Sequence, residues 1–291
     1  MSGLLALASG LAVLPLAYAG FALAVRRGLA PERVPRPEAP PGRSSRAVAF
    51  AGANGKTLRG WLLPAENAGA PALVVMHGWG GNAELMLPVA APLNAAGFAL
   101  LLVDARCHGL SDGDSFASLP RFAEDIEAAL AWLAEQPEAD RARLGVLGHS
   151  VGAGAALLVA SRQPGLRAVV SIAAFAHPAR MMRRWLAAKR IPYRPFGALI
   201  LAYVQRTIGW RFDAIAPVTT IARAHCPVLL LHGDRDDLVP YAEAEEIHAA
   251  RGEAKVELAC IPGSHDDYGD AAEAAGIAVV FLRKSLGAVA V

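Results

Sequence analysis

Residues 144–152 read Leu144-Gly145-Val146-Leu147-Gly148-His149-Ser150-Val151-Gly152. A short apolar run leads into Gly-x-Ser-x-Gly, and a helical pattern follows from Gly152 to Ser161. When this motif joins a strand to a helix, the serine occupies a strained turn, and the positions two before and two after it must be small. The motif alone is too short to be specific, so its placement between a strand and a helix makes Ser150 the candidate nucleophile.

Further apolar runs lie before and after this one. They are continuous rather than alternating, which is typical of strands buried on both faces of a parallel sheet. Helical patterns separate them, so the sequence predicts an α/β fold with a mostly parallel central sheet and helices on both faces. The expected strands are residues 72–76, 98–103, 144–147, 168–172, 228–231 and 256–261, and the expected helices are residues 85–96, 121–135, 152–161, 242–250 and 270–285. A β-hairpin over residues 47–65, turning at Asn54-Gly55, precedes them.

Composition narrows the class of protein. The 291 residues are 54% hydrophobic and 19% charged, which excludes disorder as the main state. This length suits one α/β domain with an appendage as well as two domains. The 28 basic residues nearly balance the 26 acidic ones, so nothing indicates nucleic-acid binding. The three cysteines, Cys107, Cys226 and Cys260, are far apart, and we expect free thiols rather than disulfides or a metal site.

An uncharged apolar segment opens the chain. It runs from Gly3 to Val25, and Arg26 and Arg27 follow directly. As a helix it would be about 35 Å long, more than the ~30 Å hydrocarbon layer of a bilayer. The sequence therefore predicts an N-terminal transmembrane anchor over residues 1–27, with the following domain in the cytoplasm by the positive-inside rule. The alternatives are a signal peptide cleaved near Ala19, with export, and a soluble packing helix.

The rest of the chain divides into a linker and one domain with an insertion. Residues 28–46 read as a Pro-rich basic linker, and residues 47–291 as the α/β domain. About 50 residues with a helical pattern interrupt the alternation, so we expect a short helical cap at residues 176–225. From His177 to Phe212 the cap is basic and aromatic without an acid. This pattern fits either a surface that lies on anionic lipid headgroups or an ordinary lid with a solvated basic top.

Two backbone amides are candidates for an oxyanion hole. A glycine-rich turn, His77-Gly78-Trp79-Gly80-Gly81-Asn82, follows the strand at residues 72–76. Two convergent N–H donors are needed to stabilise a tetrahedral oxyanion, and we expect them to be those of Trp79 and Val151. We expect His77 itself to make structural hydrogen bonds.

The candidate acid and base follow the last two strands. A carboxylate is needed to hold a catalytic imidazole in the right tautomer, and Asp234, Asp236 and Asp237 are all available after the strand at residues 228–231. Spacing alone does not choose between them. His265 follows the last strand and is the only histidine after His248. It is therefore the candidate base, in the chain order Ser…Asp…His.

Taken together, these motifs resemble the α/β-hydrolase superfamily from about Thr57 to the end of the chain. The similarity is to its serine esterase- and lipase-like members, which include membrane-anchored ABHD-type hydrolases. The matching segments are residues 77–81, 104–111, 148–152 and 233–240, with His265. In this family the acid belongs to a G-x-x-D-x-x-V-P segment, so the resemblance implies a catalytic triad of Ser150, Asp236 and His265. The sequence departs from the family at Cys107, where glycine is usual. Asp104, Arg106 and Ser111 around it look like loop supports, which leaves the catalytic assignment intact.

The resemblance implies a serine hydrolase that cleaves carboxylic esters, including lipid or acyl esters, through an acyl-enzyme on Ser150. Such a mechanism needs no metal or organic cofactor, and the chain has no H-E-x-x-H zinc motif. A peptidase, amidase or thioesterase with the same triad and a non-catalytic membrane-bound binding module are the alternatives. The expected partners are a small acyl or lipid ester and a membrane, contacted through the N-terminal helix and the basic cap. Nucleic acid is not expected, and nothing in the sequence indicates an oligomeric state.

Overall fold

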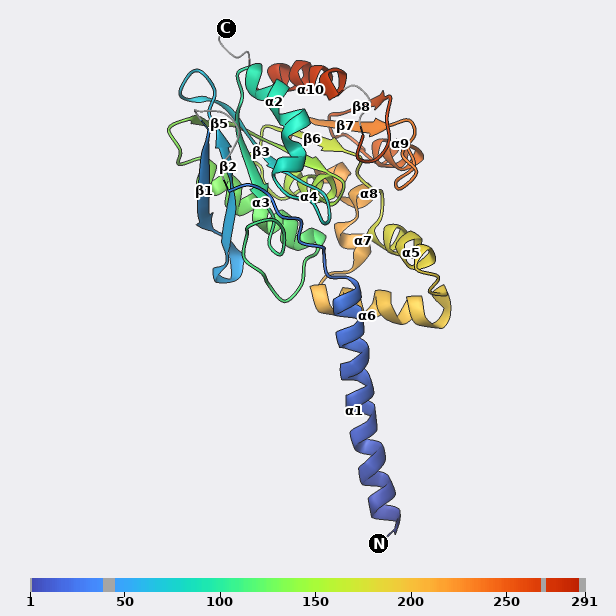
Figure 1. The fold of residues 1–291 in the computed structure, drawn as a ribbon. Helices are drawn as coiled ribbons and strands as arrows, with labels where there is room; N and C mark the ends of the chain where they lie inside the picture. The colour runs from blue at the N-terminus through green and yellow to red at the C-terminus, as the bar shows by residue number, and fades with distance from the viewer. Residues whose placement is uncertain (1, 39–44, 268–270, 288–291) are drawn as a thin grey trace.

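An eight-stranded, mostly parallel sheet forms the centre of the computed structural model, which describes residues 2–38, 45–267 and 271–287 (Figure 1). Its strand order is β1-β2-β4-β3-β5-β6-β7-β8, and only the β1–β2 and β2–β4 pairs are antiparallel. The sheet confirms the α/β fold that the sequence predicts. The strands are β1 Arg46–Ala51, β2 Thr57–Leu63, β3 Ala70–Met76, β4 Ala99–Asp104, β5 Ala139–His149, β6 Ala168–Ile172, β7 Val228–Gly233 and β8 Val256–Ile261.

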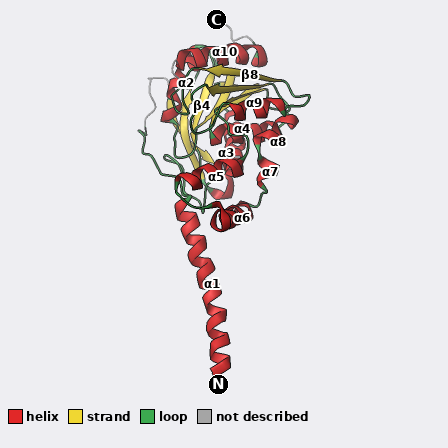
Figure 2. Ribbon diagram, turned by 90° about the vertical axis from the view of Figure 1, so that its right-hand side faces the viewer, coloured by secondary structure: helices red, strands yellow, loops and turns green. Residues whose placement is uncertain are grey.

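Helices cover both faces of this sheet (Figure 2). Successive side chains of a strand point to opposite faces, so Leu73 and Val74 enter different hydrophobic clusters. One cluster includes Leu93 of α2 and Phe281 of α10, and the other includes residues of α3, α4 and α9. Burial on both sides explains why the strands read as continuous apolar runs. The covering helices are α2 Leu87–Ala95, α3 Leu119–Leu133, α4 Val151–Ala160, α9 Ala242–Ala249 and α10 Ala271–Leu286, with a short helical turn, η2, at Glu84–Met86.

The predicted hairpin is confirmed at the edge of the sheet. β1 and β2 pair antiparallel from Arg46 opposite Leu62 to Ala51 opposite Thr57. The turn between them, η1 Ala53–Gly55, requires positive φ at two positions, 58° at Asn54 and 64° at Gly55. Asparagine and glycine tolerate that region best, so the Asn-Gly pair sets the register of the hairpin.

The interval that the sequence assigns to a cap is helical. Its elements are α5 Pro178–Ala188, η3 Tyr193–Gly197, α6 Ala198–Ile208, α7 Phe212–Ile215, α8 Pro217–Thr220 and η4 Ile221–Arg223. Two ion pairs attach α5 to α9: Arg180 contacts Glu246 at 2.6 Å, and Arg184 contacts Glu243. The second carboxylate oxygen of the buried Glu243 accepts a hydrogen bond from the Ala176 N–H at 2.7 Å. These contacts fix the start of the insertion against the domain.

The N-terminal helix α1, Ser2–Gly28, projects from the domain beside α6 (Figure 1). Its last turns pack on Tyr203 of α6: the Phe21 ring lies edge-on at 5.5 Å, and the Arg26 Nε donates to the tyrosine hydroxyl at 2.9 Å. The predicted transmembrane anchor is not supported. Within the part of the chain that the structure describes, no helix combines the length and the apolar character needed to cross a membrane.

A strap formed by residues 34–38 lies against the domain. The buried Arg36 pairs with Asp104 at 2.7 Å, and its guanidinium stacks over the Trp61 ring at 4.6 Å. The Asn82 side chain donates to the Val34 carbonyl at 3.2 Å. Because the other oxygen of Asp104 accepts the Ala83 N–H at 2.8 Å, the strap supports the end of the loop that follows β3.

Replacing Arg36 with glutamine tests the strap. Both side chains of its ion pair are 1% exposed or less, so the substitution leaves the Asp104 carboxylate buried without its cationic partner. Removing one partner of a buried ion pair typically costs about 3–5 kcal/mol, and we expect a loss of that size in the free energy of unfolding, measured with urea. Arg33→Gln is the control, since Arg33 is exposed and should change stability by less than about 0.5 kcal/mol. Equal stability of the two variants would contradict a supporting role.

Candidate active site

Ser150 occupies a strained turn between β5 and α4. Its backbone has φ 54° and ψ −114°, in a region that residues with a side chain rarely adopt. A Cβ at Gly148 would lie 2.3 Å from the Gly152 carbonyl oxygen, and a Cβ at Gly152 would lie 2.5 Å from the His77 carbonyl oxygen. Both positions therefore have to be glycine, because the backbone approaches too closely to leave room for a side chain, as the sequence predicts.

His265 lies between Ser150 and Asp236. Its Nε2 is 2.9 Å from the serine Oγ, and its Nδ1 is 2.7 Å from the Asp236 Oδ2. All three residues are buried, and each follows the carboxyl end of a parallel strand. The structure brings together the three residues that the resemblance selects. The other two aspartates point elsewhere: Asp234 accepts the Gly263 N–H at 3.0 Å, and Asp237 is exposed.

Hydrogen bonds keep the Asp236 carboxylate ionised. Its Oδ1 accepts the N–H groups of Leu238 at 3.0 Å and Val239 at 2.7 Å, and the His232 Nε2 lies 3.3 Å from its Oδ2. Burial alone would raise the pKa of Asp236, but hydrogen bonds from His232, His265 and Val239 hold it well below its usual range. His232 received no role from the sequence alone. Its position at the end of β7, four residues before the candidate acid, could have indicated that it contacts Asp236.

The glycine-rich turn after β3 abuts the nucleophile. The Gly81 N–H bonds to the Gly78 carbonyl at 3.1 Å, and Gly80 has a φ of 74°, which closes a tight turn around Trp79. A Cβ at Gly78 would lie 3.1 Å from the Cβ of Ser150. Within the described residues, neither the Trp79 nor the Val151 N–H donates to a protein group, so both donors are available next to the serine.

Two buried histidines support the site in their neutral form. The Nδ1 of His77 lies 2.6 Å from the Gly78 carbonyl oxygen, while its Nε2 accepts the Ala105 N–H at 3.1 Å. Burial lowers the pKa of His77 to about 3. The Nε2 of His149 lies 2.9 Å from the backbone oxygen of His265, and burial lowers the pKa of His149 to about 4. His149 thus fixes the backbone that carries the candidate base, a role sequence reasoning missed although the residue lies inside the motif.

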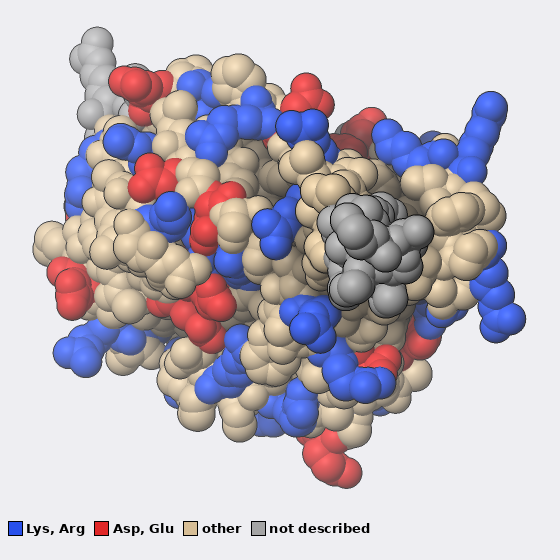
Figure 3. Space-filling view, turned by 90° about the horizontal axis from the view of Figure 1, so that it is seen from below, with Lys and Arg blue, Asp and Glu red and all other residues tan. Residues whose placement is uncertain are grey.

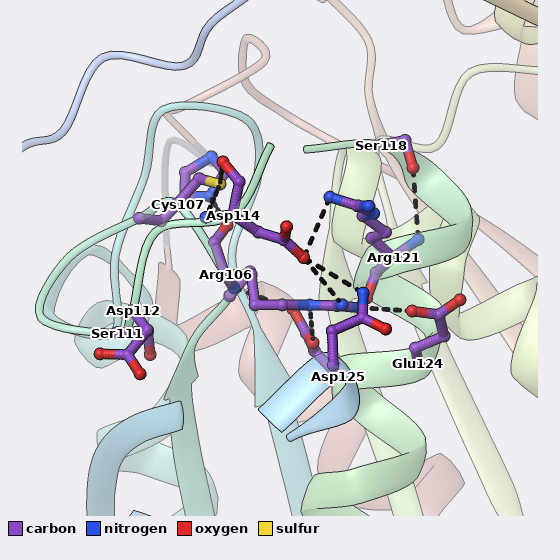
Figure 4. A network of polar contacts seen from close by, with 12 residues as sticks. Arg106, Cys107, Ser111, Asp112, Asp114, Ser118, Arg121, Glu124 and Asp125 are labelled. Carbon is purple, nitrogen blue, oxygen red and sulfur yellow. Dashed lines mark hydrogen bonds and ion pairs between the residues drawn. The ribbon is translucent and has the colours of Figure 1, made fainter. Parts of the chain in front are cut away.

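The loop after β4 is held by a network around Arg106 (Figure 4). The buried guanidinium pairs with Asp125 at 2.7 Å and with Glu124 at 2.6 Å, both on α3. Cys107 has a φ of 68°, which explains why glycine is usual there, and its Sγ accepts the Asp114 N–H at 3.2 Å. The Ser111 hydroxyl donates to the Asp104 carbonyl at 2.6 Å. These contacts agree with a supporting role for the loop.

One group of side chains among the described residues has metal-binding geometry. The ligating atoms of His149, His265 and Asp266 lie within 4.8 Å of one another. Both ring nitrogens of His265 already contact Ser150 and Asp236, so a metal there would displace the hydrogen bonds of the triad. We therefore assign these residues to the hydrolase site and not to a metal centre.

The neutral histidines predict the sign of a pH effect. His77 and His149 bind a proton near pH 6.5 when unfolded but only near pH 3 and pH 4 when folded. Their contribution to stability is complete above about pH 6.5 and is lost as pH falls, by up to about 1.4 kcal/mol per pH unit for each. Urea unfolding at several pH values between about 6.5 and 4 should show this loss in the free energy of unfolding. His77→Gln should reduce the dependence of that free energy on pH, whereas the exposed His225→Gln should leave it unchanged. A slope that His77→Gln does not alter would contradict this assignment.

Comparison with known proteins gives the same family as the geometry. A family model described as serine aminopeptidase, S33 (Hydrolase_4), matches residues 69–210. An uncharacterized protein of Mycobacterium tuberculosis strain H37Rv is 32% identical over 216 residues, which cover 74% of this chain and 70% of that protein.

Two solved esterase structures share the fold. The Pyrococcus furiosus esterase Pf2001 superposes with a TM-score of 0.68 at 23% identity, over 88% of this chain and 99% of that one. Est1E from Butyrivibrio proteoclasticus, solved with ferulic acid bound, gives a TM-score of 0.64 at 21% identity, over 82% of this chain and 98% of that one. The chain belongs to the α/β-hydrolase superfamily and is a serine hydrolase of its esterase-like kind.

Proposed function

We propose that this enzyme cleaves carboxylic esters through an acyl-enzyme on Ser150. The observation that supports the proposal is the continuous hydrogen-bonded chain from the Ser150 Oγ through both nitrogens of His265 to Asp236. A binding module has no need for a base and a residue that orients it, so this series of hydrogen bonds favours catalysis over the non-catalytic alternative.

Each residue has a role in the proposed reaction. His265 takes the proton from the Ser150 Oγ as the oxygen attacks the carbonyl carbon of the ester, and Asp236 stabilises the imidazolium that forms. The N–H groups of Trp79 and Val151 donate to the oxyanion, and each such donor typically lowers the barrier by about 2.7–4 kcal/mol. His265 then returns the proton to the leaving alcohol, and a water molecule repeats the sequence to release the acid.

The charge of the insertion favours esters over peptides with a free amino terminus. An aminopeptidase must hold the substrate ammonium, and a carboxylate on the insertion would attract it. The exposed Asp266 lies beside His265, so the comparison concerns the insertion alone. Residues 177–212 contain no acid, and Glu243 and Glu246 behind them are paired with Arg184 and Arg180. Neutral or anionic acyl groups therefore suit this surface better than cationic ones. Amides and thioesters would use the same three residues, so comparison of p-nitrophenyl esters with matched anilides and thioesters tests the preference.

Replacing Ser150 with alanine should abolish ester hydrolysis. Loss of the nucleophile in a serine enzyme lowers kcat by about 10⁶-fold, which would reduce hydrolysis of p-nitrophenyl acyl esters to the background rate. The circular dichroism spectrum should stay unchanged, and labelling by a fluorophosphonate probe should disappear. Ser161→Ala, at the end of α4, is the matched control and should keep both activity and labelling. Turnover by the purified Ser150→Ala enzyme would overturn the proposal.

Asp236→Asn tests whether Asp236, and not a neighbouring aspartate, is the acid of the triad. The amide preserves shape but favours the wrong tautomer of His265, and in a well-studied serine protease this change lowers kcat by about 10⁴-fold. The exposed Asp237→Asn is the control and should keep near-normal kcat, because the Asp237 side chain points to solvent and makes no hydrogen bond or ion pair with Ser150 or His265. If the two variants were equally active, Asp236 would not be the acid.

A further inference from the structure

We infer that the outward face of α6 binds the surface of an anionic bilayer. This face is defined by Leu199, Ala202 and Arg206 of α6, which recur at three- and four-residue spacing and so lie on one side of the helix. Two flanking residues extend it: Phe196 of η3, and Trp210, which follows the left-handed Gly209 at the end of α6. The inference concerns where the enzyme resides and is independent of the ester chemistry.

Large apolar side chains on this face are left exposed, although the Arg162 guanidinium lies over the Trp210 ring at 4.9 Å. Phe196 and Leu199 are each 56% exposed, and Trp210 is 41% exposed, whereas Leu201 and Tyr203 on the inner side are buried. A helix with apolar residues outward and cations at its edges is the form that lies in the headgroup region of a membrane. The face is therefore built for contact with the acyl–headgroup boundary.

The structure divides the cations of the insertion into two groups. Arg180 and Arg184 are paired with glutamates of α9, and Arg183 donates to the Tyr193 hydroxyl at 3.1 Å. Within the described part of the chain, the rest have no carboxylate within ion-pair distance, and they are exposed: Lys189, Arg190, Arg194, Arg206, Arg211 and Arg223. Cations gathered without counter-charge complement an anionic surface, and each contributes about fivefold to membrane affinity.

A shallow hollow of about 390 Å³ lies at the carboxyl end of this face. Gln205, Arg206, Gly209, Trp210 and Arg211 line it. Two guanidinium groups beside an indole match a lipid phosphate and the glycerol region next to it, because arginine binds phosphate in a bidentate manner and tryptophan favours the membrane interface. The hollow therefore adds a binding place for one lipid headgroup to the positive charge of the face.

The position of α6 makes the face accessible to a flat surface. The helix lies at the base of the molecule, on the side from which α1 projects (Figure 1). Viewed from that side, basic side chains are spread over the surface (Figure 3). Leu16, Tyr18 and Leu23 on the adjoining α1 are 72%, 57% and 49% exposed, so α1 adds exposed apolar surface on this side of the molecule.

Other occupants fit less well. A second copy of the chain would bring two uncompensated basic faces together, which like-charge repulsion opposes. Nucleic acid would engage the arginines but gain nothing from exposed leucine and phenylalanine side chains. An anionic bilayer satisfies both the charge and the apolar stripe.

The test measures sedimentation of the full chain with vesicles of phosphatidylcholine alone and of phosphatidylcholine with phosphatidylglycerol. We expect tighter binding to the anionic vesicles and weaker binding as salt is added. The double variant Arg194→Gln/Arg206→Gln should bind the anionic vesicles roughly 25-fold more weakly, about fivefold for each charge. Its matched control is Arg141→Gln/Arg167→Gln, which removes two exposed cations outside the insertion, near the amino ends of β5 and β6, and should bind like the parent.

Each outcome is decisive. Equal binding to both kinds of vesicle, or an equal loss in the two double variants, would overturn the inference. A dimer that Leu199→Ser dissociates, without any vesicle binding by the parent, would assign the face to a second copy and also overturn it. Hydrolysis of a soluble ester is measured in every variant: retained hydrolysis shows a folded enzyme, so failure of membrane binding and failure of the proposed ester chemistry are distinguishable.

Discussion

Close backbone packing between β5, α4 and the end of β3 is the constraint on which the site depends. A Cβ at Gly152 would lie 2.6 Å from the Met76 carbonyl oxygen and 2.5 Å from that of His77, so the first turn of α4 rests on the end of β3. The same contact presents Ser150 at a strained φ and places the Gly78 turn against it. The proposed nucleophile and the proposed oxyanion donors are therefore positioned together by contacts between these three elements.

Electrostatics around the triad follow from burial and hydrogen bonding. His77 and His149 are kept neutral because their surroundings exclude water, while Asp236 remains ionised because several donors converge on it. The imidazole of His265 thus lies between the Ser150 hydroxyl and the buried Asp236 carboxylate, with the exposed Asp266 carboxylate nearby. In the proposed reaction this arrangement stabilises the imidazolium without any rearrangement of the protein.

Two segments outside the sheet are attached to the domain by ion pairs. The strap carries Arg36 to Asp104, which also accepts the N–H groups of Ala83 and Leu110, so the chain after α1 supports the loops after both β3 and β4. The helical insertion is attached to α9 through Glu243 and Glu246. These pairs use some of the basic residues for structure and leave the others on the surface, which is what gives the α6 face its uncompensated charge.

Local patterns in the sequence predicted the strands, the helices and the candidate nucleophile. Continuous apolar runs predicted the strands, Asn54-Gly55 predicted the hairpin turn, and Gly-x-Ser-x-Gly at a strand–helix junction predicted Ser150. Spacing could not choose between Asp234, Asp236 and Asp237, and the family resemblance made that choice. The apolar segment at the N-terminus suggested a membrane anchor that the structure does not support.

Only the tertiary structure decided which groups meet. Asp236 faces His265 while Asp234 bonds to Gly263, because the loops after β7 and β8 pack side by side although 29 residues separate the acid from the base. His149 and Arg36 received no role from the sequence, since their partners are distant along the chain, whereas His232 lies only four residues from Asp236. Periodicity reports whether a side chain faces the core or solvent, whereas the partner of a polar side chain is set by how strands that are far apart in the sequence lie next to one another.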